Sequence, residues 1–196
     1  MRKAVLLALL LLPAAGLVVA SGGDNNDQGE NDNHRIPAIL AFDTMYGVEG
    51  PLLGEANAIR GVVGDEAPWV IDHYIRGRLD VTGRLKIAVK GLVFGNDPLS
   101  PPDFIGKNDE PTFRGLVSCL TEGPNETIVV ANVETDEFPA SLQGDSLIQQ
   151  KLDLPSPCIA PIIFVMAGSE EKWFAVTGFE KAESSSSGDS STHHHH

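Results

Sequence analysis

The stretch IRGRLDVTGRLKIAVKG, residues 75–91, decides the fold class of this chain. Apolar residues and glycine alternate with polar residues on both sides of the motif Asp80-Val81-Thr82-Gly83. Alternation with a period of two is typical of a β-strand with one buried face. The motif suits a type I turn whose last residue, Gly83, takes the left-handed conformation, which gives a three-residue hairpin loop. The stretch therefore predicts an antiparallel hairpin.

The register of this hairpin predicts which side chains share a face of the sheet. The inner face is expected to pair Leu79 with Leu85, Gly77 with Ile87, Ile75 with Val89, His73 with Gly91 and Ile71 with Val93. The outer face is expected to pair Asp80 with Arg84, Arg78 with Lys86, Arg76 with Ala88, Tyr74 with Lys90 and Asp72 with Leu92. Because successive side chains point to opposite faces, all five cations are expected to point outward.

These outward cations form the first candidate binding site, which comprises Arg76, Arg78, Arg84, Lys86 and Lys90 with Tyr74 among them. Arg78 opposite Lys86 is a like-charge pair that costs stability unless an anion lies nearby. An acidic polysaccharide, a carboxylate-rich partner or the acidic surface of another copy of the chain would supply that anion. The alternative is a solvated outer face, since surface ion pairs contribute little and exposed strands often carry Lys to discourage aggregation.

The same short apolar runs, broken by Gly, Pro, Asn and Asp, continue through the chain. Strands are expected at 36–42, 57–62, 69–80, 84–94, 112–120, 127–134, 146–154, 158–166 and 172–179. Helix is expected to be scarce, with at most a turn near 52–57. About nine short strands predict an all-β, single-domain antiparallel β-sandwich or a partly open barrel.

The two ends of the chain differ from this central part. Arg2 and Lys3 precede an uncharged apolar run that ends at Ala20, which is typical of a secretory signal peptide and too short for a spanning helix. Residues 21–35 and 182–196 contain no large apolar side chain and are expected to be a disordered polar linker and a disordered Ser/His tail. The β-sandwich domain is therefore expected at 36–181, in an extracytoplasmic location that is secreted, periplasmic or at the cell surface.

Cys119 and Cys158 are the only two cysteines. In an oxidising compartment such a pair is expected to form one disulfide. The formal charge of the chain is -13. Without residues 1–20 the chain has 12 Lys and Arg against 27 Asp and Glu, a formal charge of -15. This acidity argues against nucleic-acid binding, and no membrane insertion is expected after cleavage.

Residues 95–111, GNDPLSPPDFIGKNDEP, form a long connection that carries a second candidate site. Its oxygen-bearing side chains, Asp97, Asp103, Asn108, Asp109 and Glu110, could converge on one Ca²⁺. The alternative is an ordinary turn-rich loop, because Asp and Asn dominate turns. No other cofactor is predicted.

The sequence argues against an enzyme. It lacks G-x-S-x-G, H-E-x-x-H and a glycine-rich phosphate loop. Apart from the four histidines at 193–196, which suit either a purification handle or a native metal-binding tail, the only histidines are His34 and His73. His73 is expected on the core face. Asn125-Glu126-Thr127 has the form of a glycosylation sequon.

The apolar run IPAILAF at 36–42 is expected to pair with its own sheet, or else to be donated to the open edge of another copy. Together these features predict a secreted, non-catalytic β-sandwich module for surface binding or self-assembly, with a homo-oligomer or a cell-surface assembly as its setting. The alternative function is a polysaccharide- or small-ligand-binding module that uses Ca²⁺, and the third is a glycoside hydrolase or other hydrolase.

Overall fold

The predicted hairpin is formed by β4 (Trp69–Asp80) and β5 (Arg84–Phe94), which pair antiparallel in the computed structural model. The structure describes residues 36–180, so the expectations for 1–20, 21–35 and 182–196 lie outside the described residues. The register pairs Leu79 with Leu85 and Arg78 with Lys86, as predicted. Gly83 has a φ of +80° and its N–H donates to the carbonyl of Asp80 at 3.0 Å, which confirms the turn.

β4 and β5 are the middle of a four-stranded sheet with the order β1-β4-β5-β9. β1 (Ala38–Phe42) pairs antiparallel with β4, so the apolar run at 36–42 joins the sheet of its own chain. β9 (Ser146–Lys151) pairs antiparallel with β5 on the other side. The cationic hairpin therefore has a strand on each flank.

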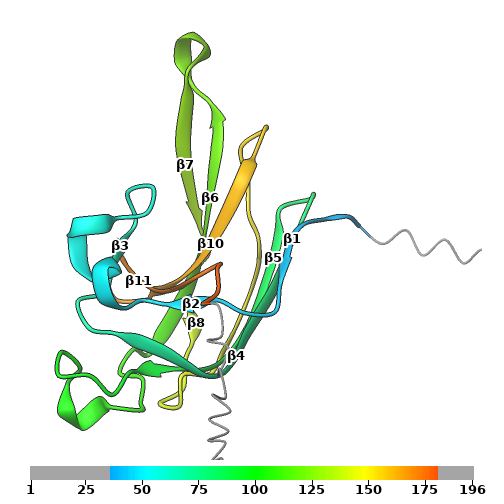
Figure 1. Cartoon of the computed structure of the whole chain (residues 1–196). Coiled ribbons are helices and arrows are strands. Elements are labelled where there is room, and N and C mark those ends of the chain that lie inside the picture. The colour runs from blue at the N-terminus through cyan, green and yellow to red at the C-terminus, as the bar shows by residue number, and fades with distance from the viewer. Residues whose placement is uncertain (1–35, 181–196) are drawn as a thin grey trace, which may run out of the picture. The chain divides into compact units, whose positions relative to one another are not determined.

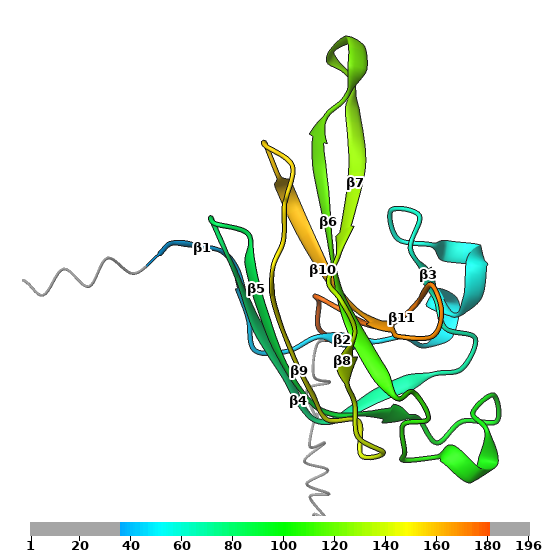
Figure 2. The same cartoon turned by 180° about the vertical axis from the view of Figure 1, so that it is seen from behind.

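A second sheet of seven strands lies against the first (Figures 1 and 2). Its path runs through β2 (Tyr46–Gly47), β11 (Lys172–Val176), β10 (Ile159–Ala167), β6 (Thr112–Glu122) and β7 (Ile128–Glu134). Two short strands lie off this path: β3 (Val63–Gly64) pairs parallel with β11, and β8 (Phe138–Pro139) pairs with β6. The fold is thus an all-β sandwich, and its sheets do not close into a barrel.

Helical structure in the described chain is limited to single 3₁₀ turns. These are η1 (Gly50–Leu52), η2 (Gly54–Asn57), η3 (Pro102–Phe104) and η4 (Pro124–Glu126). The predicted turn near 52–57 therefore exists. No helix between residues 36 and 180 is long and apolar enough to cross a membrane.

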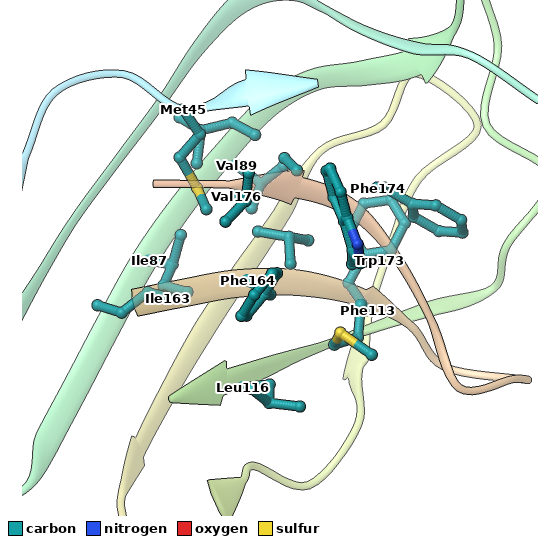
Figure 3. Close-up of a cluster of buried hydrophobic side chains, with 14 of the residues drawn as sticks. Met45, Ile87, Val89, Phe113, Leu116, Ile163, Phe164, Trp173, Phe174 and Val176 are labelled. Atoms are coloured by element: carbon teal, nitrogen blue, oxygen red, sulfur yellow. The ribbon is translucent and has the colours of Figure 1, made fainter. Parts of the chain in front are cut away.

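Aromatic rings join the two sheets at one end of the core. Trp69 of β4 stacks on Phe174 of β11 with ring centroids 3.8 Å apart, and Phe113 of β6 meets Phe174 edge-on at 5.9 Å. Aromatic pairs in these geometries add to the stability gained from burial alone. Figure 3 shows Ile87 and Val89 of β5 beside Phe164 of β10 and Val176 of β11. The inner face of the hairpin therefore supplies part of the core, as its alternation predicts.

Gly115 of β6 lies where the two sheets pack closely against each other. A Cβ at this position would lie 3.0 Å from a methyl group of Leu85 and 3.3 to 3.4 Å from methyl groups of Ile148 and Ile87. All three belong to β5 and β9 of the opposite sheet. Close packing of this kind explains why a residue without a side chain occupies the middle of a buried strand.

The predicted strand at 57–62 and the predicted register at the open end of the β4–β5 hairpin are both wrong. No named strand covers 57–62, because Arg60 and Gly61 both have positive φ, at 51° and 80°, and close a tight turn bridged by Ile59 and Val62.

His73 of β4 is exposed, whereas it was expected on the core face. The β4–β5 register shifts between Ile71 and Tyr74, where Gly91 has a φ of +73°. The extra residue of this bulge turns His73 outward and moves Ile71 from the predicted Val93 to Leu92, so the predicted pair of Asp72 with Leu92 does not form either.

The disulfide between Cys119 and Cys158 forms as predicted, with a Cα–Cα distance of 5.0 Å. Cys119 lies in β6 next to Leu120, which pairs with Ile159 at the start of β10. β6 forms an antiparallel hairpin with β7, and β10 forms one with β11. The bridge therefore ties β6 to β10 at the point where the β6–β7 hairpin leaves the body of the sheet (Figure 1).

Candidate functional site

The outer face of the four-stranded sheet carries the predicted cations. Arg76 and Arg78 alternate with buried Ile75 and Leu79 on β4, and the remaining three alternate with buried apolar residues on β5. We call this surface the cationic face and define it by Arg76, Arg78, Arg84, Lys86, Lys90 and Lys151. Lys151 belongs to it because it is the direct cross-strand partner of Arg84 on β9. Six of the ten Lys and Arg between residues 36 and 180 therefore share one face.

Lys151 was not among the residues that the sequence singled out. A strand at 146–154 was expected, but nothing in the pattern indicated that this strand lies beside β5. Pairing Gln149 with Lys86 and Leu147 with Ala88 places two more β9 side chains on the cationic face. Residues that join a site through strand order, rather than through a local turn, carry no signal in the sequence alone.

Most of these charges lack an acidic partner. Within the described chain, Lys90 is the only member of the cationic face that forms an ion pair, with Asp145 at 2.7 Å. This hydrogen bond raises the pKa of Lys90 and lowers the pKa of Asp145. Arg78 donates to the backbone carbonyl of Ile36, and the guanidinium of Arg76 lies 4.7 Å from the centre of the Tyr74 ring. The positive charge of the face is therefore largely uncompensated by carboxylates.

A shallow groove of about 370 Å³ crosses the middle of the cationic face. Its charged lining residues are the cations Arg76, Arg78 and Lys86 and one acid, Asp43, and its apolar contacts come from Phe42, Ala88 and Leu147. The Leu147 side chain is 53% exposed although it lies on a regular strand. A groove that combines cations with apolar surface suits a ligand whose anionic groups are carried on a carbon skeleton.

Asp80 stabilises the β4–β5 turn at the end of the cationic face, but its side chain is not part of that face. The structure buries Asp80, and its Oδ1 accepts hydrogen bonds from the backbone N–H of Thr82 at 2.9 Å, the Thr82 hydroxyl at 2.6 Å and the backbone N–H of Arg84 at 3.2 Å. The expected pairing of Asp80 with the Arg84 side chain is therefore replaced by a bond to the Arg84 backbone. The Thr82 hydrogen bonds are the main cause of a lowered pKa for Asp80.

We expect Asp80→Ala to lower the free energy of unfolding by about 1 to 2 kcal/mol, because three donors of the turn lose their acceptor. Asp80→Asn keeps one acceptor oxygen and should lose less. Since the folded chain holds Asp80 ionised below its ordinary pKa, the wild type should lose stability relative to Asp80→Asn as the pH falls below about 4. Urea unfolding at pH 7 and pH 3 measures both effects, and a constant difference between the two pH values would contradict this role.

The loop that carries the candidate Ca²⁺ site is held by hydrogen bonds within the loop and to neighbouring segments. The buried Asn108 amide donates to the carbonyls of Glu110 at 2.7 Å and Ser141 at 2.9 Å, and its oxygen accepts from the N–H of Glu110 at 2.9 Å. Asp97 accepts from the N–H of Leu99, and Glu110 accepts from Ser169. Asp103 and Asp109 are both exposed, and desolvation of the Asp109 carboxyl by its neighbours raises its pKa. Between residues 36 and 180, no three acidic, Cys or His side chains are grouped to hold a metal ion.

Asn125, the first residue of the sequon, lies in η4 at the tip of the β6–β7 hairpin and is exposed.

Comparisons of the chain with protein families, curated proteins and solved structures found nothing that matches the chain. What the fold and the site define is therefore a disulfide-linked β-sandwich with a cationic outer sheet face on an otherwise acidic chain.

Proposed function

We propose that this protein is a secreted, non-catalytic β-sandwich module that binds an anionic partner through the cationic face. The observation that carries the proposal is the segregation of charge: six of ten described Lys and Arg lie on one sheet face, and only Lys90 of these six is paired with a carboxylate there. The same described residues contain 21 Asp and Glu, so the cationic face belongs to an otherwise acidic chain. A positively charged face on a negatively charged protein orients an anionic partner toward that face.

The cross-strand pair of Arg78 and Lys86 supports the same function. The two residues are direct partners in the β4–β5 register, and Gln149 is the next residue across on β9. Like charges in such positions repel each other, so a bound anion would remove a cost that the free protein carries. Arg78 also lines the groove with Arg76, whose planar guanidinium suits carboxylate groups. An acidic polysaccharide carries repeated carboxylates along an extended chain.

The leader-like residues 1–20 and the Cys119–Cys158 bridge support an extracytoplasmic location for this binding. A polysaccharide of a cell envelope or extracellular matrix is the partner class that such a compartment offers. Because the rest of the surface is acidic, we expect binding to depend on the ionic strength and to be confined to one face.

Binding of polygalacturonate, a linear polysaccharide with one carboxylate per sugar, tests the proposal. Lys86→Glu should lower the affinity about tenfold, and Arg78→Glu with Lys86→Glu by about a hundredfold, because each reversal exchanges an attraction for a repulsion at close range. Lys107→Glu is the matched control: it makes the same charge change on an exposed loop lysine away from the face. Calorimetric titration at several salt concentrations measures the affinities.

Two results would refute the proposal. One is a wild-type chain that binds polygalacturonate no better than uncharged dextran. The other is an equal loss of affinity in Lys86→Glu and Lys107→Glu, since a general charge effect would then explain binding. Circular dichroism of each variant ensures that lost binding is not lost fold.

A further inference from the structure

β7 (Ile128–Glu134) is the last strand of the seven-stranded sheet, and in the described structure it pairs only with β6. The β6–β7 hairpin projects beyond the body of the sandwich, which leaves the outer edge of β7 open (Figures 1 and 2). Three successive apolar residues on this strand are exposed: Ile128 at 61%, Val129 at 38% and Val130 at 43%. An open edge of this length has backbone groups available to another strand.

The two edges of the four-stranded sheet, β1 and β9, are protected in ways that β7 is not. β1 follows Pro37 and its register with β4 shifts between Ala38 and Leu40, which breaks the regularity that a pairing strand needs. β9 carries two glutamines and ends at Lys151. Charges, prolines and bulges of this kind prevent pairing between molecules. β7 has none of them between Ile128 and Val133, so its edge is suited to strand addition.

A row of apolar side chains leads to this edge across three strands. Ile159 of β10 pairs with Leu120 of β6, and Leu120 pairs with Val130 of β7, so their side chains lie on the same face of the sheet. Ile159 is 51% exposed. Ile128 lies two residues before Val130 and therefore on that same face. An exposed apolar row that ends at an open edge is typical of an interaction surface.

We propose that the partner of this edge is β7 of a second copy of the chain, paired antiparallel about a two-fold axis at Val129. In this register Ile128 of each copy faces Val130 of the other. The apolar row of one copy then continues into Ile128 of the second copy, because a two-fold axis normal to the sheet keeps the same face outward in both. The two sheets join into one.

Neighbouring registers are less favourable. An axis at Val130 would place Ile128 opposite Asn132 of the second copy, so an apolar side chain would face a polar amide. An axis at Ala131 would place Ile128 opposite Glu134 and would use the end of β7 where Asn132 donates to the carbonyl of Arg60 at 3.4 Å. The register at Val129 uses the projecting half of the hairpin and opposes no two acids.

The register predicts one specific cross-link. Val129 lies on the axis, so a cysteine there would face the same cysteine of the second copy at a distance that a disulfide can span. Val129→Cys should give a covalent dimer under mild oxidation, whereas Ala131→Cys and Val133→Cys should give little, because neither faces itself. Both native cysteines are already bonded to each other, so they do not compete. Non-reducing electrophoresis of the full chain measures the dimer.

Light scattering over a concentration series tests the interface without a cross-link. Val130→Lys should raise the dimer dissociation constant about tenfold or more, since it places a charge in the paired edge. Leu99→Lys is the matched control: Leu99 is an apolar residue outside β7 that is 63% exposed, more than Val130, and it is changed in the same way. Added salt should strengthen this dimer, because each copy has an excess of acidic residues that salt screens.

A strict monomer at high concentration would overturn the proposal. So would cross-linking that is as efficient at Val133→Cys as at Val129→Cys. A dimer that dissociates in salt and persists in Val130→Lys would also overturn it, since such a dimer would use the cationic face. Binding of polygalacturonate is independent of these outcomes, so this interface and the proposed function fail separately.

Discussion

Replacement of both Cys119 and Cys158 by alanine is expected to lower the free energy of unfolding by about 4 kcal/mol. The bridge joins residues 39 positions apart, and a loop of that size removes about 4 kcal/mol of chain entropy from the unfolded state. The enclosed loop contains all of β7, β8 and β9. Loss of the bridge therefore affects both the strand that completes the cationic face and the strand that carries the open edge.

Guanidinium unfolding of the wild type and the double alanine variant, each with and without reductant, measures this loss. Reductant should weaken the wild type to nearly the level of the variant and leave the variant unchanged. A loss below about 1 kcal/mol, well under the chain-entropy value, would mean that the reduced, unfolded chain is already restricted in this region.

Arg114→Met is expected to cost about 2 to 4 kcal/mol at pH 7, because it breaks the most buried ion pair of the described structure. The Arg114 side chain is 12% exposed and lies 2.5 Å from Glu134. It also donates to the backbone carbonyl of Ala167 at 2.9 Å and to that of Glu170 at 2.8 Å, both in the β10–β11 hairpin. One side chain thus joins β6, β7 and β10, and methionine of similar length cannot replace any of these bonds.

The cost of Arg114→Met should depend on pH. Burial already raises the pKa of Glu134, and the positive charge of Arg114 opposes that rise. Without Arg114 the pKa rises further, so the folded variant takes up a proton more readily than the unfolded chain. A carboxyl group whose pKa is raised in the folded state makes the protein less stable as the pH rises from the unfolded pKa of the group through its folded pKa. The difference between variant and wild type should therefore be largest near pH 7 and should shrink toward pH 4.

The double variant Arg114→Met with Glu134→Gln is the control. It removes the partly buried carboxylate that Arg114→Met leaves unpaired, and Glu171, the other acidic partner of Arg114, is 76% exposed. The double variant should therefore recover part of the stability that Arg114→Met loses, and its deficit should vary less with pH. Thermal unfolding between pH 4 and pH 8 measures all three chains. A deficit that grows as the pH falls would contradict this account of Glu134.

The β4–β5 hairpin shows how far a local pattern determines structure. Alternation from Tyr74 to Leu79 and the Asp80–Gly83 turn were sufficient to predict the strands, the turn and which side chains share a face. Beyond Tyr74 the prediction of register was wrong, because the bulge near Gly91 inserts a residue that alternation does not reveal. A single inserted residue reverses the face of every side chain after it.

The candidate site was predictable only in part for a related reason. Five cations of the cationic face lie in one hairpin and could be grouped from its turn, whereas Lys151 and Leu147 joined the face only when β9 paired with β5. Ile59 and Val62 resemble strand residues in the sequence, yet the positive φ values of Arg60 and Gly61 place them in a tight turn against the second sheet. Packing against other segments decided both cases.

The sequence by itself determined the all-β class, the cationic hairpin and the disulfide, because each of these follows from contacts close in the chain or from a lone pair of cysteines. Only the tertiary structure decided the order of strands, and with it the members of the cationic face and the open edge of β7. The physical reason is that strand pairing between distant segments depends on packing the whole core at once, and many orders satisfy the same local alternation.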